Sequence, residues 1–137
     1  YNTLFNLLTQ DDQVRCFENV AAHLDDDGVF VVEAFVPSWL HRLTENQYVA
    51  AETIEASRVV LDMGRHDPVA QTLDESHVQF SEDGRIRFGP IVCRYAWPSE
   101  LDLMARIAGL RLRERWSGWE RQPFTVDSRN CISVFGR

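Results

Sequence analysis

The pattern of hydrophobic and polar positions predicts an amphipathic helix followed at once by a buried strand. Between residues 9 and 24, apolar residues recur at helical spacing and charged residues fall mostly on the other face. Thr9 is the expected N-cap, with Asp12 three residues later. Residues 28–35 read GVFVVEAF, which is apolar on both faces. This run predicts a strand that lies inside a sheet between parallel neighbours, most of which we expect the sequence to lack.

The remaining pattern predicts an antiparallel insert and a second helix followed by two strands. Pro37 breaks the backbone pattern, and a short helical turn is expected at 39–43. Residues 47–97 alternate between apolar and polar, which indicates about four antiparallel strands with a hairpin turn at 81–84. Pro98 opens a helix that ends at Gly109, and strands follow at 111–116 and 131–135. Residues 1–8 are expected to be loop-like.

This order of elements indicates an α/β fold. We expect a single domain over 1–137 that contains an antiparallel β flap at 45–97, because a chain of 137 residues is long enough for one core. The strand at 28–35 ends close to Glu33, its one charged residue. Ligands of open α/β sheets gather beyond the carboxyl ends of the strands, so the functional site is expected there.

Charge and composition narrow the classes of function. Lys and Arg number 14 against 21 Asp and Glu, which gives a net charge of -7 and argues against a nucleic-acid partner. No apolar run is long enough to cross a membrane. The three cysteines are widely spaced and predict reduced thiols, and the four histidines lack the spacing of zinc ligands. We therefore expect an acidic cytoplasmic protein with no metal site.

Four phrases of the sequence, in this order, resemble one enzyme family. They are NTLFNLLTQDDQVRCFENVAAHL, DDDGVFVVEAF, RYAWPSELDLMARIAGLRLRERW and CISVFGR. Together they resemble the carboxyl-terminal half of a class I S-adenosylmethionine-dependent methyltransferase of the small-molecule type. The resemblance implies the later strands and helices of a Rossmann-like sheet, with the insert as a flap over the substrate. It implies S-adenosylmethionine as cofactor and methyl transfer to an O or N atom of a small-molecule acceptor.

The resemblance also implies two sets of site residues. The cofactor-binding set is Asn2, Thr3, Leu4 and Phe5. The acceptor-binding set is Glu33, Phe35, Tyr48, Arg94, Tyr95 and Trp97. No catalytic residue is assigned, because methyl transfer from a sulfonium depends mainly on alignment and on the exclusion of water.

Two features predict that the sequence is part of a longer enzyme and inactive by itself. It begins at Tyr1 rather than Met, and its glycines are isolated, with no GxGxxG loop for the cofactor. One alternative is a truncated, non-catalytic fragment that forms a homodimer through an exposed sheet edge. Another is a ligand-binding antiparallel module built from the insert.

Overall fold

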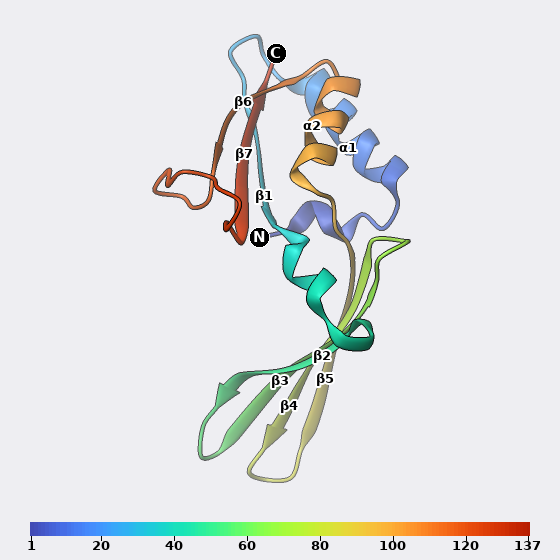
Figure 1. Ribbon diagram of the computed structural model, residues 1–137, viewed down its shortest axis with the longest axis vertical. Coiled ribbons are helices and arrows are strands. Elements are labelled where there is room, and N and C mark those ends of the chain that lie inside the picture. Colours follow the sequence, from blue (N-terminus) through green and yellow to red (C-terminus); the bar gives the residue numbers. More distant parts are fainter. The chain divides into compact units, whose positions relative to one another are not determined.

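The computed structural model describes residues 1–137, which form two compact units (Figure 1). The first unit combines residues 1–38 with residues 95–137, and the second contains residues 39–94.

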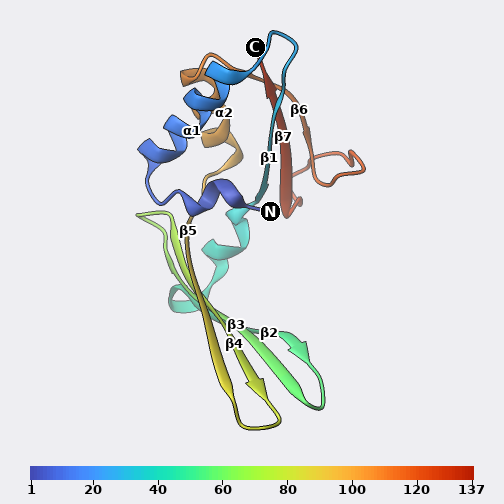
Figure 2. The same cartoon turned by 180° about the vertical axis from the view of Figure 1, so that it is seen from behind.

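The first unit is a three-stranded sheet with two helices on one face. The sheet has the order β1 (Phe30–Phe35), β7 (Asn130–Gly136), β6 (Arg111–Trp116), and both pairings are antiparallel. Helices α1 (Gln10–His23) and α2 (Pro98–Ile107) lie side by side on the same face of the sheet (Figures 1 and 2). The core between them contains Phe17, Val32, Ala34, Leu101, Met104 and Phe135. The predicted helices and final strands are therefore confirmed.

Strand β1 is covered on one face only. Val32 and Ala34 are buried, whereas the side chain of Val31 is 39% exposed. The sheet partner of β1 is the antiparallel β7, and no parallel neighbour lies along its other edge. As the apolar run predicts, the described residues supply no parallel strand along the free edge of β1.

The N-terminus of α1 is capped as the sequence predicts. The Thr9 hydroxyl oxygen accepts a hydrogen bond from the backbone N–H of Asp12, at 3.1 Å. Asp11 and Asp12 place negative charge in the first turn, where the helix dipole favours it.

Replacing Thr9 with alanine is expected to lower the free energy of unfolding by about 1 kcal/mol, because an N-cap hydrogen bond is lost. Thermal and urea melts measure this change. The control is Thr44→Ala. Thr44 is exposed, and it belongs to a short 3-10 helix that has no side-chain cap hydrogen bond. A Thr9→Ala loss no larger than that of the control would contradict the capping role.

The second unit is a four-stranded antiparallel sheet, as predicted for the insert. Its order is β2 (Gln47–Ile54), β3 (Arg58–Asp67), β4 (Thr72–Ser81), β5 (Ile86–Arg94). Two short 3-10 helices, η2 (Pro37–Arg42) and η3 (Thr44–Asn46), precede it, and η2 coincides with the predicted helical turn. Gly84 closes the β4–β5 hairpin with a φ of 77°, a conformation that favours glycine.

The first residues are more ordered than the sequence predicts. Thr3–Asn6 form a 3-10 helix, η1, in which Leu4 and Phe5 are buried. In both views η1 lies beside the carboxyl end of β1 (Figures 1 and 2). Among all the helices, none has both the length and the apolar character that crossing a bilayer requires.

Candidate functional site

A pocket of about 490 Å³ lies against β1 in the first unit. Its walls come from η1, α1, β1 and the loop after β6, and they are mostly apolar. The lining residues are Tyr1, Thr3, Leu4, Leu7, Cys16, Phe30, Val31, Val32, Glu33 and Trp119. Three residues that the sequence assigned to a site, Thr3, Leu4 and Glu33, therefore share one pocket.

Glu33 is the polar centre of this pocket. The indole N–H of Trp119 donates a hydrogen bond to Glu33 Oε1, at 3.1 Å. Glu33 Oε2 lies 3.1 Å from the backbone nitrogen of Tyr1. The indole orients the carboxylate, which can accept hydrogen bonds from a ligand amine or hydroxyl. Sequence reasoning missed Trp119 because it stands alone in a loop, 86 positions from its partner.

Asn2 attaches η1 to the edge of β1. Its side-chain Oδ1 accepts a hydrogen bond from the backbone N–H of Phe35, at 2.8 Å, and Asn2 itself has a φ of 41°. The bond satisfies a strand-edge donor that points away from β7. Asn2 therefore positions the neighbouring Thr3 and Leu4 against the pocket.

Three aromatic residues from the predicted sets pack together. The ring centroids of Phe5 and Phe35 are 5.1 Å apart in an edge-to-face arrangement, and those of Phe35 and Tyr95 are 6.5 Å apart. Phe5 and Tyr95 are fully buried. An edge-to-face pair such as Phe5 and Phe35 stabilises the fold beyond its buried area, so these rings hold η1 against the end of β1.

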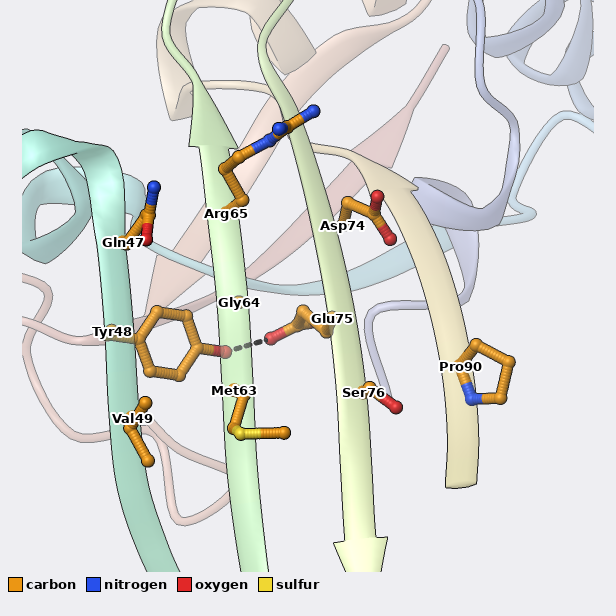
Figure 3. A pocket seen from close by; sticks show the side chains of 10 residues that line it. All are labelled: Gln47, Tyr48, Val49, Met63, Gly64, Arg65, Asp74, Glu75, Ser76 and Pro90. Carbon is orange, nitrogen blue, oxygen red and sulfur yellow. Dashed lines mark hydrogen bonds between the residues drawn. The ribbon is translucent and has the colours of Figure 1, made fainter.

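The second unit has a hollow of about 660 Å³ across its strands (Figure 3). Tyr48 on β2, Gly64 on β3 and Glu75 on β4 are direct neighbours in register. The Tyr48 side chain extends across Gly64 and donates its hydroxyl hydrogen bond to Glu75 Oε1, at 2.6 Å. Asp62 also lies within hydrogen-bond distance of the same hydroxyl, at 3.1 Å. A phenol flanked by two carboxylates is thus fixed in place.

Burial raises the pKa values of two groups in this cluster. Removal from water raises the pKa of Glu75, and burial together with the Glu75 contact raises the pKa of Tyr48. A carboxyl group whose pKa is raised by folding stabilises the fold in its protonated form, and that contribution is lost as pH rises through the folded-state pKa.

Replacing Glu75 with glutamine is therefore expected to raise the melting temperature relative to the natural chain, increasingly so from about pH 4 to about pH 8. Glutamine keeps an oxygen that accepts the Tyr48 hydrogen bond but cannot ionise. Melting curves over this range measure the effect, and Glu55→Gln, at an exposed position, is the control. A difference in melting temperature between Glu75→Gln and the natural chain that does not change with pH would contradict a raised pKa of Glu75.

Arg94 and Trp97, the remaining residues of the predicted acceptor-binding set, lie at the end of a strand and at the start of a helix. Arg94 ends β5, is 6% exposed and donates from Nη2 to Gln71 Oε1, at 3.3 Å. Trp97 is the N-cap residue of α2. Tyr48 and Arg94 belong to the second unit, and the other predicted residues belong to the first.

Comparison with solved structures finds similar proteins that are methyltransferases. The chain is similar to the CcbJ methyltransferase from Streptomyces caelestis, with 43% sequence identity over 99% of the chain and a TM-score of 0.93. The chain has part of the methyltransferase fold. The sequence resemblance to S-adenosylmethionine-dependent methyltransferases is therefore confirmed. The chain spans 57% of the length of CcbJ.

More distant structures show the same fold. A S-adenosylmethionine-dependent methyltransferase from Clostridium acetobutylicum matches 98% of the chain at 12% identity, with a TM-score of 0.81, over 55% of its own length. CalS10, an amino pentose methyltransferase from Micromonospora echinaspora, matches 100% of the chain at 19% identity, with a TM-score of 0.66, over 56% of its length. No protein-family model matches the sequence, and comparison with curated proteins gives no match.

Proposed function

We propose that this chain is part of a longer enzyme that transfers a methyl group from S-adenosylmethionine to an O or N atom of a small molecule. The observation that carries the proposal is the similarity to CcbJ over almost the whole chain. The fold shared with CalS10, whose structure contains S-adenosylmethionine, supports the same cofactor. The chain spans little more than half the length of each of these proteins.

The residues around β1 fit such a cofactor. Thr3 and Leu4 would contact it directly, and Asn2 and Phe5 would hold η1 in place through Phe35. A mostly apolar pocket with a few polar groups is typical of small-molecule sites. S-adenosylmethionine, when bound, supplies an electrophilic methyl group on a sulfonium.

The acceptor set would orient the other reactant and exclude water. Glu33, oriented by Trp119, would accept a hydrogen bond from an acceptor amine or hydroxyl and would take up the proton that the acceptor loses. Phe35, Tyr95 and Trp97 would form apolar walls. The assignment of Tyr48 and Arg94, which belong to the second unit, to acceptor binding stays a prediction. Exclusion of water and alignment of the acceptor are the main requirements of this reaction.

The experiment compares the 137-residue chain with the longer enzyme that contains it. We expect methyl transfer by the longer enzyme alone, and a kcat/KM lowered roughly 100-fold or more by Glu33→Gln, as for a lost acid–base group. Glu18→Gln on the exposed face of α1 is the control. A longer enzyme that neither binds S-adenosylmethionine in calorimetry nor transfers its methyl group would refute the proposal.

The alternative is a truncated, non-catalytic chain that forms a homodimer through a sheet edge. The outer edge of β1 supports it: the Phe35 N–H points away from β7, so the backbone groups of Val31 and Glu33 point the same way. A dimer in solution that ignores the cofactor would favour this alternative. A monomer that binds the cofactor would end it.

We also propose a cytoplasmic location. All three cysteines are free thiols, and two of them, Cys93 and Cys131, are buried. Free thiols are typical of reducing compartments. Fractionation of producing cells would test the location.

A further inference from the structure

Two histidines of the second unit meet where η2 lies against the sheet. His66, on β3, is 3% exposed, whereas His41, near the end of η2, is an exposed residue. Their ring centroids are 5.2 Å apart in an edge-to-face arrangement. The His66 ring also has a hydrogen bond with the backbone of Leu40. Because imidazole is the side chain that ordinarily gains its proton between pH 8 and pH 5, this contact can respond to pH.

The surroundings of His66 favour its neutral form. Burial and the neighbouring His41 lower the pKa of His66, and the carboxylate of Asp67 offsets part of this effect. In the register of the sheet, His66 lies beside Leu73 on β4, and Leu73 lies beside Cys93 on β5. Burial raises the pKa of the Cys93 thiol to about 12, so the thiol carries no charge near pH 6. A proton on His66 is therefore poorly compensated in this contact.

The other charged residues of the neighbouring elements are placed differently. Three of them point to the opposite face of the sheet, because each adjoins a residue of the His66 row: Arg65, Asp74 and Arg94. Glu75 shares the face of His66 but lies in the next row, where it binds the Tyr48 hydroxyl. Arg42 and Glu45 are exposed. The groups that act on His66 are thus its immediate neighbours.

The chain between η2 and β2 contains backbone strain. Glu45 has a φ of 54° and Asn46 a φ of 56°, so two successive residues other than glycine lie in the left-handed region. Asn tolerates this region, whereas Glu is held there only when the surrounding structure fixes it. Most residues of the stretch 41–46 are exposed, but the preceding Leu40 is fully buried. The stretch therefore has a buried anchor before it and strain at its end, and His41 links it to the sheet.

We propose that residues 41–46 form a pH-sensitive latch, which lies against β3 while His66 is neutral and leaves it when His66 gains a proton. Leu40 stays buried, so the movement is confined to the exposed stretch and relieves the strain at Glu45. The latch connects η2 to β2, the first strand of the insert. Its opening therefore frees the entry of the chain into this sheet. The proposal concerns the fold of the insert and goes beyond the proposed reaction.

The direction of the pH effect follows from proton binding. In the open state His66 is exposed to water and has the ordinary histidine pKa of about 6.5. The closed contact lowers the pKa of His66, so the closed latch binds fewer protons than the open one. The closed state therefore keeps its full stability above about pH 6.5 and loses it as the pH falls toward the lowered pKa. At about pH 5.5 the ratio of closed to open molecules should have fallen by up to roughly 10-fold.

The test is amide hydrogen exchange of the natural chain, followed by NMR at about pH 7.5 and about pH 5.5. The readout is the protection factor of the Leu43 amide, which donates to the Leu40 carbonyl at 3.3 Å. A protection factor is already corrected for the direct effect of pH on exchange, so it reports the opening of the latch. We expect it to fall roughly 3- to 10-fold at the lower pH. In His66→Gln, whose side chain cannot ionise, we expect no fall.

Two control variants separate His66 from other groups of the sheet. His77→Gln changes an exposed histidine on β4, and Glu75→Gln changes a carboxyl group whose pKa burial raises. Both variants should keep the fall in protection, because neither alters the contact between His41 and His66.

A second measurement keeps the test decisive if His66→Gln does not fold. The ring signals of His66 should titrate below about pH 6.5 in the natural chain and closer to it in His41→Gln. A protection factor that does not change with pH, a fall that persists in His66→Gln, or a His66 pKa at or above about 6.5 would overturn the proposal. None of these readouts depends on methyl transfer, so their failure is distinct from failure of the proposed function.

Discussion

Replacing Gly64 with alanine is expected to lower the free energy of unfolding of the second unit by about 2–4 kcal/mol, as for overpacking that also breaks a buried hydrogen bond. A Cβ at Gly64 would lie 2.8 Å from Cζ of the Tyr48 ring. The ring cannot move away at low cost, because its hydroxyl is bound to Glu75 and its edge meets Trp39 at 5.2 Å between centroids. Urea-induced unfolding followed by tyrosine and tryptophan fluorescence measures the loss.

Two controls separate this clash from the general effect of adding a methyl group to a strand. A Cβ at Gly89 on β5 would meet its nearest atom at 3.6 Å, an ordinary contact. Gly89→Ala is therefore expected to be neutral or to stabilise by up to about 1 kcal/mol, through the unfolded chain. In a Tyr48→Ala background, Gly64→Ala should cost little. An equal cost with and without the Tyr48 ring would contradict the explanation.

Local signals in the sequence predicted most of the elements. The conformation at a helix end or a turn depends on neighbours within four residues. Such positions are marked here by the pair Thr9 and Asp12 and by Pro98, Gly84 and Gly109. Capping and turn preferences act over that range, so the two main helices and the β4–β5 hairpin follow from them. The alternation of apolar and polar residues over 47–97 predicted about four strands, because this pattern is also local in the sequence.

Contacts between distant residues could not be predicted in the same way. Trp119 meets Glu33 from 86 positions away, and Asn2 meets Phe35 from 33. Neither residue belongs to a spaced motif. The pairing of β1, β7 and β6 brings the loop of Trp119 close to Glu33, and the packing of η1 beside β1 brings Asn2 close to Phe35. The family resemblance pointed to Asn2 and Glu33 but gave no geometry for them. Their assigned roles toward a ligand stay predictions.

The alternating pattern of the insert also did not predict what packs against its sheet. Alternation shows that a sheet has an apolar face, but it does not say what covers that face. The register is what shows that Leu61, Val78 and Phe88 lie in one row across three strands. Exposure then shows that Phe88 and its neighbours on β5 are open.

Removing the Asp102 carboxylate is expected to destabilise the first unit by about 2–3 kcal/mol, because it leaves a largely buried guanidinium without its counter-charge. Arg115 on β6 is 13% exposed, and its Nη2 lies 2.5 Å from Asp102 Oδ1 on α2. The same guanidinium donates to Pro98 O and, from Nε, to Ser133 Oγ at 2.9 Å. It therefore joins α2 to both β6 and β7. Because Asp102 is 33% exposed, solvent reduces the loss below that of a fully buried pair.

The matched control is an ion pair of the same type at the surface. Glu55 Oε2 lies 4.0 Å from Arg58 Nε, and both side chains are exposed. Glu55→Ala should therefore change the free energy of unfolding by less than about 0.5 kcal/mol. The double variant Asp102→Leu with Arg115→Met should be more stable than Asp102→Ala, because no charge is left unpaired. Chemical denaturation of all four chains measures these differences. If Asp102→Ala costs no more than Glu55→Ala, α2 is held on the sheet by its apolar side chains, Leu101 and Met104, and not by this pair.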